Sequence, residues 1–494
     1  MMTASARTPA GFGIRRGEDS MNLHFNSSCD CARLAPLLSV RGTAAILFCA
    51  LFSLAACAQT FTTLTSFNGT NGANPIFTAL VQGLDGNLYG TTSAKGAHGK
   101  GTVYKITPTG TLTTLYSFCA LSKCTDGSTP YAGLVLGTDG NFYGTTFTGG
   151  TLNAGTVYKI TPAGKLTTLH SFNFSDGYNP YDALVQGSDG NFYGTTSTGG
   201  AHLSGNVFKM TPQGTVTNLH SFNSSDGSTP EAGLIQGTDG KFYGTTYNGG
   251  GAGSYGTAFK ITPAGALTTL HFFEDSVDGR SIVSGLVEAS DGNFYGTASL
   301  GGPLGYGTVY KMTSAGAVTV LHNFDVTDGS SPNLLLLASD GNFYGTTISS
   351  GANGDGTIFE MTSSGTLTTL HNFDGTDGDL PFAGPAQATD GNLYGVAQFG
   401  GSKDDGTVYR VHLGLAPFVK TVPLAAKVGT KVNILGNKLT GATSVTFSGS
   451  AAAFTVVSAT QITTTVPATA TSGTVQVTTS TSTLSSNVAF RITK

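Results

Sequence analysis

Tryptophan is absent from this chain of 494 residues, and charged side chains make up only 11% of it. Helical sequence is scarce as well, because no stretch keeps an apolar period of 3.6 residues. Short runs rich in Val, Thr, Phe and Tyr instead alternate with Asp-Gly and Pro-x-Gly turn signals, and the 71 glycines fit many tight turns. We therefore expect an all-β protein.

Acidic residues are missing from the last part of the chain. Residues 416–494 carry six Lys and Arg and no Asp or Glu, whereas residues 59–415 carry 13 Lys and Arg against 25 Asp and Glu. Phosphate binding needs a basic face, so the acidic part argues against nucleic acid as a partner. The basic part is suited to contact anionic glycans or lipid or to dock on the acidic part, and a merely solvated surface is the alternative.

A membrane-spanning run is not evident either. The apolar segment 44–56 follows Arg41 but is shorter than the roughly 20 residues that a span needs. Its form is that of a signal-peptide core, so we expect an exported protein, secreted or held at the cell-envelope surface. Residues 1–58 would be the leader, and Met21 fits as an alternative start. Two cleavage sites stay open: a lipobox ending at Cys57, whose lipid would tether the protein to a membrane, or a cut after Ala58 that would release it.

Cysteine is sparse beyond the leader, where only Cys119 and Cys124 remain. Both lie in an insertion that lengthens their repeat interval. In an oxidising compartment we expect a disulfide between them, with two unpaired thiols as the alternative. The insertion lacks the ligands of a metal site, and we expect neither a metal nor a cofactor in this protein.

One repeated unit dominates the chain. Its Asp-Gly-Asn tripeptide, once Asp-Gly-Lys, recurs at steps of 49 to 54 residues. The copies begin at Asp85, Asp139, Asp189, Asp239, Asp291, Asp340 and Asp390. Self-similarity at this period is typical of propellers and solenoids. Each unit holds four strand candidates, with an Asp-Gly turn between the first two and a tight turn between the last two, as in residues 183–222.

The two ends of the repeat region complement each other. Residues 61–67 have the pattern of a fourth strand without a unit before it, and the last unit stops after its third strand, at His412. Ring-shaped propellers complete their last blade with such a strand. We therefore predict a seven-bladed β-propeller over residues 59–412, closed by the N-terminal strand.

The unit GLVQGxDGNFYGTTxxGG, followed by GTVYKITPxGxLTTLHSF, resembles the GloVer tandem-repeat family of bacterial exported proteins over residues 60–412. That resemblance implies a propeller-like surface protein without an assigned activity, and the absence of tryptophan separates it from kelch and WD40 repeats. After a linker at 413–417, residues 418–494 resemble an IPT/TIG domain through KVGTKVNILGNKLTGATSVTF, GTVQVTT and NVAFRIT. This resemblance implies an immunoglobulin-like β-sandwich, and about seven short strands fit that fold.

Loops that differ between the units are the best candidates for a ligand site. The loops before the first strands and those between the second and third strands share one face, and their aromatic and polar side chains suit stacking on sugars and bonding to hydroxyls. The candidates from the first kind of loop are Phe77, Tyr131, Tyr181, Asp182, Glu231, Arg280 and Phe382. Those from the second kind are His98, Lys100, His202, Tyr255, Tyr306, Asp355, Asp404 and Asp405. Ordinary loop side chains without a ligand are the alternative.

Histidine recurs in the TTLH motif, at His170, His220, His271, His322 and His371. These residues would lie on the outermost strands of different units, too far apart to share an ion at zinc-ligand distances. We expect them to serve packing.

No catalytic constellation is evident, because the innermost strands are apolar and nearly interchangeable. We therefore expect a non-catalytic binding or interaction protein, a monomer, which recognises a glycan, an envelope polymer or an envelope protein through the propeller rim. A polysaccharide-acting hydrolase or lyase using Asp182 and Glu231 is the alternative. A structural spacer in the cell envelope is the second alternative.

Overall fold

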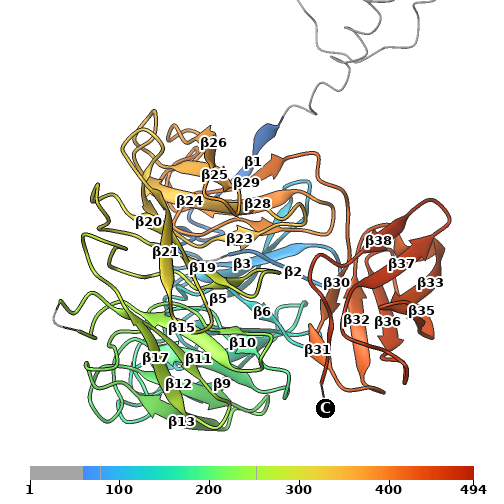
Figure 1. Ribbon diagram of the computed structural model, residues 1–494, viewed down its shortest axis with the longest axis horizontal. Helices are drawn as coiled ribbons and strands as arrows, with labels where there is room; N and C mark the ends of the chain where they lie inside the picture. The colour runs from blue at the N-terminus through green and yellow to red at the C-terminus, as the bar shows by residue number, and fades with distance from the viewer. Residues whose placement is uncertain (1–58, 78, 252, 494) are drawn as a thin grey trace, which may run out of the picture. The chain divides into compact units, whose positions relative to one another are not determined.

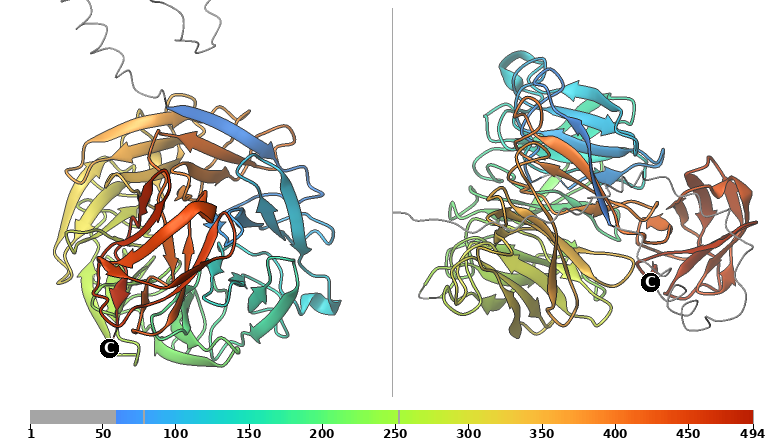
Figure 2. Two further views of the ribbon diagram at one scale, coloured as in Figure 1. Left: turned by 90° about the vertical axis from the view of Figure 1, so that its right-hand side faces the viewer. Right: turned by 90° about the horizontal axis from the view of Figure 1, so that it is seen from above.

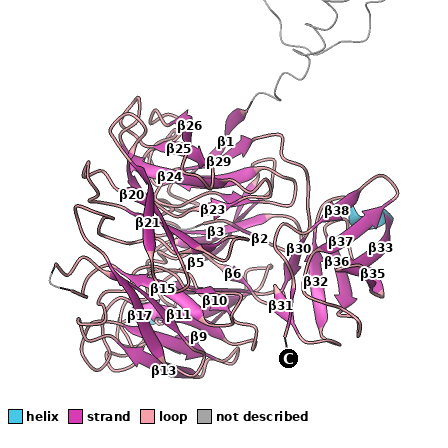
Figure 3. Ribbon diagram, viewed as in Figure 1, coloured by secondary structure: helices cyan, strands magenta, loops and turns pink. Residues whose placement is uncertain are grey.

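The computed structural model describes residues 59–77, 79–251 and 253–493, which belong to one compact unit. The described part is almost entirely β-structure (Figures 1 and 3), which confirms the all-β prediction. Its helices are two single 3₁₀ turns, η1 (Ser122–Cys124) and η2 (Leu439–Gly441). No helix in these described ranges has the length and hydropathy to cross a membrane. The predicted leader and Cys57 lie outside the described residues.

Each repeat unit forms an antiparallel sheet, and its first two strands flank the Asp-Gly turn. The first strands are β2 (Val81–Gln82), β6 (Val135–Leu136), β10 (Val185–Gln186), β14 (Ile235–Gln236), β18 (Val287–Glu288), β23 (Leu336–Leu337) and β27 (Ala386–Gln387). The second strands are β3 (Leu88–Thr92), β7 (Phe142–Thr146), β11 (Phe192–Thr196), β15 (Phe242–Thr246), β19 (Phe294–Ala298), β24 (Phe343–Ser349) and β28 (Leu393–Ala397). The first strands are shorter than the sequence pattern suggested.

The third and fourth strands extend each sheet outward. The third strands are β4 (Thr102–Ile106), β8 (Thr156–Ile160), β12 (Asn206–Met210), β16 (Thr257–Ile261), β20 (Thr308–Met312), β25 (Thr357–Met361) and β29 (Thr407–His412). The fourth strands are β5 (Leu112–Ser117), β9 (Leu166–Ser171), β13 (Val216–Ser221), β17 (Leu267–Phe272), β21 (Val318–Asn323) and β26 (Leu367–Asn372). An additional short strand, β22 (Ser330–Pro332), pairs with β24. The sheets lie side by side around a common centre (Figure 2).

The fourth strand beside β29 comes from the beginning of the chain. β1 (Thr60–Ser66) runs antiparallel to β29, with Thr60 opposite His412 and Ser66 opposite Thr407. The resulting sheet has the order β1-β29-β28-β27. Residues more than 300 positions apart therefore lie in one sheet.

Each Asp-Gly-Asn tripeptide is held by its own aspartate. In the unit of β10 and β11, Asp189 accepts hydrogen bonds from the backbone N–H of Asn191 at 3.1 Å and from its side-chain amide at 2.7 Å. The hydroxyl of Tyr193 donates to the same carboxylate at 2.8 Å. Gly190 has a φ of 81°, which a residue with a Cβ adopts only with strain. These bonds explain why the four residues recur together.

The second strands also supply the contacts between neighbouring sheets. Tyr193 of β11 stacks on Phe242 of β15 with ring centroids 3.9 Å apart, and Tyr143 of β7 stacks on Phe192 of β11 at 4.0 Å. All four side chains are buried. The Phe-Tyr pair of the repeat therefore builds a core between neighbouring sheets.

The TTLH histidines bind aspartates within their own units. The Nε2 atom of each lies 2.5 to 3.0 Å from a carboxylate in the loop that follows its strand. The pairs are His170–Asp176, His220–Asp226, His271–Asp278, His322–Asp328 and His371–Asp377. In the unit of β5, the hydroxyl of Tyr116 donates to Asp126 at 2.7 Å instead. This position therefore fastens the loop between the fourth strand and the next unit.

The last residue of several first strands links neighbouring sheets. The side chain of Gln186 accepts a hydrogen bond from the backbone N–H of Thr138 at 3.0 Å, and that of Gln236 accepts one from Ser188 at 2.9 Å. Gln82 accepts the backbone N–H of Thr389 at 2.9 Å in the same way. The last of these bonds joins the first unit to the final one.

Residues beyond 418 form a separate β-sandwich. One sheet has the order β30-β32-β36-β35, another has the order β34-β33-β37-β38, and β31 pairs in parallel with β39. The bounds are β30 (Lys420–Val422), β31 (Ala425–Ala426), β32 (Lys431–Leu435), β33 (Ala442–Phe447), β34 (Ser450–Ala451), β35 (Phe454–Val456), β36 (Gln461–Thr465), β37 (Val475–Thr479), β38 (Thr483–Ser485) and β39 (Arg491–Ile492). A core that includes Ile434, Phe447 and Phe490 fills it.

The sandwich forms hydrogen bonds to the repeat region at the ends of first strands. Thr460 donates from its hydroxyl to the carbonyl of Leu84 at 2.8 Å. Lys420 donates to the carbonyl of Gln387, and Arg491 donates to that of Gly237. All three acceptors lie in a first strand or within two residues after one, on the side of the Asp-Gly turns.

The third strands carry either tyrosine or phenylalanine at one buried position. Within the described residues, the hydroxyls of four such tyrosines have no hydrogen-bond partner. These are Tyr104, Tyr158, Tyr310 and Tyr409. Phe208, Phe259 and Phe359 occupy the same position in other units and are also buried.

We predict that Tyr158→Phe stabilises the protein. A buried hydroxyl without a partner loses its hydration and gains nothing in return, so its removal should raise the free energy of unfolding by about 1 kcal/mol. Denaturation in urea measures the change. The reverse substitution, Phe208→Tyr, is the matched control and should lower stability. Equal stability of both variants and the wild type would contradict this account.

Candidate functional site

The loops that precede the first strands bring together four aromatic side chains, which we call the aromatic cluster. Its members are Phe77, Tyr131, Tyr181 and Phe382, all half-buried. Tyr181 lies 5.0 Å from Phe77 and 5.7 Å from Tyr131 between ring centroids. Phe382 lies 5.2 Å from Phe77. Loops from four different units therefore form one continuous aromatic surface.

The repeat explains why these residues meet. Each lies four positions before the start of its first strand, so the four side chains are equivalent members of different units. Because the units surround a common centre, equivalent loop positions converge there. The same position holds Glu231 in the unit of β14 and Val283 in that of β18. The cluster is therefore aromatic on one side and carries a carboxyl group on another.

Asp182 is held rigidly beside the aromatic cluster. Its carboxylate accepts hydrogen bonds at 2.6 Å from the backbone N–H of Ala183 and, in the next unit, from that of Gly233. Burial raises the pKa of Asp182 to about 6, although the two N–H donors favour the charged form. The side chain thus connects two neighbouring loops.

Glu231 is the second carboxyl group with a shifted titration. Burial raises its pKa to about 7. The pKa of Tyr181 is raised mainly by burial, and the charge of Glu231 adds to this shift. A carboxyl group with a pKa near neutrality can act as a hydrogen-bond donor or as an acceptor around pH 7. The site therefore offers aromatic faces together with an adaptable polar group.

The space between these loops is small. A cavity of about 20 Å³ is bordered by Phe77, Asp182, Ser284, Asn333 and Phe382, among others. That volume suits roughly one water molecule rather than an organic ligand. Asn333 partly fills the space, because its amide donates to the carbonyl of Phe382 and accepts from the backbone N–H of Leu334 at 2.8 Å. A ligand would therefore rest on the aromatic cluster and not enter the centre.

Three of the residues proposed from sequence stand apart from this arrangement. Arg280 is exposed, and its Nε lies 2.9 Å from Asp275. His98 and His202 are exposed on loops between second and third strands, away from the loops that converge. The structure thus brings together Tyr131, Tyr181 and Phe382 with Phe77, and places Asp182 and Glu231 beside them.

Two aromatic residues near the site were missed in the sequence. Phe147 lies 4.8 Å from Tyr131 between ring centroids, and the charge of Tyr247 contributes to the raised pKa of Tyr181. Both directly follow a second strand. Other units have Ser93, Ser197 or Ser299 there, so variation at this position was the available signal.

Cys119 and Cys124 are joined by a disulfide around η1, with Cα atoms 4.0 Å apart. The same loop is fastened by Asp126, which accepts the backbone N–H of Ala120 at 2.9 Å. No group of three or more His, Cys, Asp or Glu side chains in the described ranges is placed to hold a metal ion.

Comparisons with known proteins agree with this architecture. The sequence model of the Gloeobacter/Verrucomicrobia repeat matches residues 48–255 and 235–454, and that of the IPT/TIG domain matches residues 418–492. No curated protein matches the chain.

Among solved structures, one titled "Streptogramin B lyase structure" is similar with a TM-score of 0.51 and 14% identity, over 72% of this chain and 98% of that one. A fungal alcohol oxidase in complex with copper has a TM-score of 0.45 and 15% identity, over 85% of this chain and 98% of its own. At such identities the first likeness shows a propeller-like fold and nothing about activity.

We predict that stability falls as the pH rises from about 4 to about 7. The pKa values of Asp182 and Glu231 are raised to about 6 and about 7 in the folded protein, so the native state binds more protons than the unfolded chain in this window. Since one pKa unit corresponds to about 1.4 kcal/mol, the loss should be about 2–3 kcal/mol for each carboxyl group. Urea denaturation across this range measures it.

The substitution Glu231→Gln should make this decline shallower, because the amide does not titrate. Glu274→Gln, at an exposed carboxyl group, is the matched control and should leave the slope unchanged. Identical slopes in the wild type and Glu231→Gln would show that Glu231 does not titrate in this window.

Proposed function

Because the chain belongs to the family of the Gloeobacter/Verrucomicrobia repeat, we propose that it is an exported, non-catalytic binding protein that recognises a glycan or an envelope polymer. The repeat, the IPT/TIG domain and the propeller-like fold suit a binding or interaction protein. The observation that carries the proposal further is the aromatic cluster, a half-buried surface of four rings on loops that vary between units.

The chemistry of the aromatic cluster matches the surface of a sugar polymer. Aromatic rings pack against the apolar faces of pyranose rings, while carboxyl groups bond to hydroxyls. Tyr131, Tyr181 and Phe382 supply the rings, and Glu231 supplies a polar group beside them. The small cavity beneath favours a ligand that lies across the surface, as a polymer does.

Export rests on the leader sequence. The apolar segment 44–56 has the form of a signal-peptide core, and cleavage there would place the mature protein outside the cytoplasm. A lipid on Cys57 would hold it at a membrane face, and a cut after Ala58 would release it. The disulfide between Cys119 and Cys124 fits an oxidising compartment.

The ring that presents the aromatic cluster would be a closed propeller of seven blades over residues 59–412. The pairing of β1 with β29 supports closure, and so do the bond between Gln82 and Thr389 and the ion pair of Lys95 with Asp405. Each connects the first or N-terminal element to the last unit. A rigid ring would keep the four cluster loops in register, which a surface for a repetitive polymer requires.

A second candidate function is a polysaccharide-acting hydrolase or lyase. It is favoured by the two carboxyl groups with raised pKa values, since Glu231 at about 7 would be protonated in part near neutrality and could serve as an acid. Asp182, held by two backbone N–H groups, would be its partner. Turnover of a polysaccharide that is lost in both Asp182→Asn and Glu231→Gln would establish this function in place of the first.

We predict that the double variant Tyr131→Ala/Tyr181→Ala loses affinity for glycans or envelope fractions that the wild type binds. Each aromatic contact contributes about 0.5–1.5 kcal/mol, so the affinity should fall about tenfold or more. A glycan array and pull-down from envelope fractions would measure binding, with titration calorimetry on the best ligand.

The matched control is Phe174→Ala/Phe272→Ala, which removes two exposed aromatic side chains that are not members of the aromatic cluster. It should bind as the wild type does. Equal loss in both double variants would locate binding elsewhere, and no binding by the wild type would favour a structural spacer. Thermal unfolding of every variant separates lost contacts from lost folding.

Ring closure predicts that cysteines at positions 62 and 410 form a disulfide. Thr62 lies opposite Arg410 in the ladder between β1 and β29, so Thr62→Cys/Arg410→Cys should crosslink within one chain. Because the bond closes a very long loop, it should stabilise the protein by up to about 4 kcal/mol. Mass spectrometry and thermal unfolding measure both effects. Thr62→Cys/Thr407→Cys, out of register, is the control, and exclusively intermolecular crosslinks in the first variant would show an open chain.

A further inference from the structure

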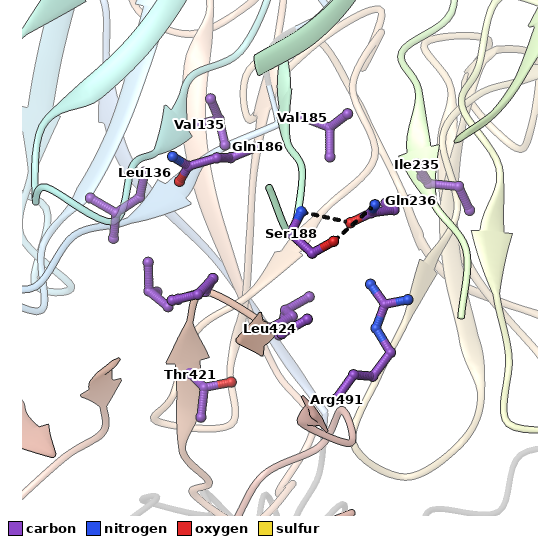
Figure 4. A pocket seen from close by; sticks show the side chains of 13 residues that line it. Val135, Leu136, Val185, Gln186, Ser188, Ile235, Gln236, Thr421, Leu424 and Arg491 are labelled. Atoms are coloured by element: carbon purple, nitrogen blue, oxygen red, sulfur yellow. Dashed lines mark hydrogen bonds between the residues drawn. The ribbon is translucent and has the colours of Figure 1, made fainter. Parts of the chain in front are cut away.

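A second cavity lies at the opposite end of the first strands from the aromatic cluster. Its volume is about 320 Å³, near the lower end of the roughly 300–1,000 Å³ range of small-molecule sites. The repeat region contributes residues of β6, β10 and β14, and the sandwich contributes residues 421–425 and Arg491 (Figure 4). This cavity is large enough for a small organic ligand.

Most of the cavity wall is apolar. Val135, Val185 and Ile235 come from three neighbouring first strands, and Leu424 faces them from the sandwich. The side chain of Leu424 is 47% exposed, which shows that the cavity is open to solvent. Removing apolar surface from water is favourable, so this wall is suited to cover the hydrocarbon group of a ligand.

The amide side chains in the wall are already engaged. Gln236 accepts the backbone N–H of Ser188 at 2.9 Å and donates to its hydroxyl at 3.2 Å. Gln186 accepts the N–H of Thr138 at 3.0 Å and donates to the carbonyl of Gly190 at 3.1 Å. The amide groups of Gln186 and Gln236 therefore hold neighbouring sheets together, and a ligand would bond to other side chains.

Arg491 is the polar side chain of the wall that has capacity left. The hydroxyl of Thr421 also has no hydrogen-bond partner in the described part of the chain, but its oxygen is buried and so is closed to a ligand. The guanidinium of Arg491 donates to the carbonyl of Gly237, and it forms no ion pair with a described carboxylate. In Figure 4 this guanidinium extends from the sandwich toward Gln236. An arginine side chain carries five N–H groups, and in the described part of the chain that of Arg491 uses one of them, for the carbonyl of Gly237. The other N–H groups can therefore bond to a ligand.

The charge of Arg491 is only weakly balanced. Asp239 and Glu288 act on it at longer range, and Glu288 already accepts the hydroxyl of Thr238 at 2.7 Å. Burial lowers the pKa of Arg491, which indicates that its surroundings do not fully replace water. A carboxylate at this position would form charge-assisted hydrogen bonds with the planar guanidinium.

We propose that this cavity binds a compact amphipathic carboxylate, whose hydrocarbon part lies among Val135, Val185, Ile235 and Leu424 and whose carboxylate lies at Arg491. Since both domains line the cavity, a bound ligand contacts the repeat region and the sandwich at once. The site is separate from the aromatic cluster, so either proposal stands or falls without the other.

The experiment uses decanoate as the probe, with decanol as the uncharged molecule of equal chain length. Titration calorimetry and native mass spectrometry of the full chain should detect one decanoate per protein, and decanol should bind more weakly. Arg491→Gln should reduce decanoate affinity about tenfold, as expected for a lost charge-assisted hydrogen bond. Lys427→Gln, at an exposed cation of the same sandwich, is the matched control and should bind as the wild type does.

A second variant guards against a folding defect in Arg491→Gln. Val185→Phe narrows the cavity while keeping Arg491, and it should abolish binding. Its circular dichroism spectrum should match that of the wild type, which would show that the variant is folded. The proposal is overturned if decanoate does not bind the wild type, or if it binds the wild type, Arg491→Gln and Val185→Phe with equal affinity.

Discussion

The antiparallel pairing of β1 with β29 is the interaction on which the rest of the repeat region depends. It unites residues from the two ends of the repeats in one sheet, with Phe61 opposite Val411. Phe61 stacks on His371 of the preceding unit at 3.7 Å, and Phe67 lies 5.1 Å from Tyr104 of the first unit. A single strand thereby contacts three units. Without it, β29 would lie at the edge of its sheet.

The first strands of the units have two chemically different ends. At one end, loops before the strands vary from unit to unit and converge in the aromatic cluster. At the other end, the Asp-Gly turns are nearly constant, because each aspartate must hold its own turn and a tyrosine hydroxyl. The constant end is where Thr460 and Arg491 of the sandwich bond to backbone carbonyls. A surface of repeated backbone groups suits docking of a domain, and a variable surface suits a ligand.

Repetition also explains how far sequence reasoning reached in the candidate site. Tyr131, Tyr181 and Phe382 were recognisable because they occupy one position in different units, and equivalent positions meet at the centre. Arg280, His98 and His202 were grouped with them only because their loops lie on the same face. Those side chains are exposed on separate loops, and a loop's direction away from the centre depends on local backbone geometry rather than on residue type. Phe147 was overlooked because its position directly after a second strand was not among the loop positions compared.

The sequence by itself determined the all-β class, the repeated four-strand unit, the Asp-Gly turns and the presence of a C-terminal IPT/TIG domain. The first three follow from local rules, since period, turn chemistry and strand patterning act over a few residues. The IPT/TIG domain follows from the resemblance of residues 418–494 to that family. Only the tertiary structure decided that Asp182 bonds to Gly233 of the next unit, that Arg491 and Thr421 line a cavity, and that the cavity beside the aromatic cluster measures only about 20 Å³. Those features depend on side chains from distant units filling a common space, which no local pattern specifies.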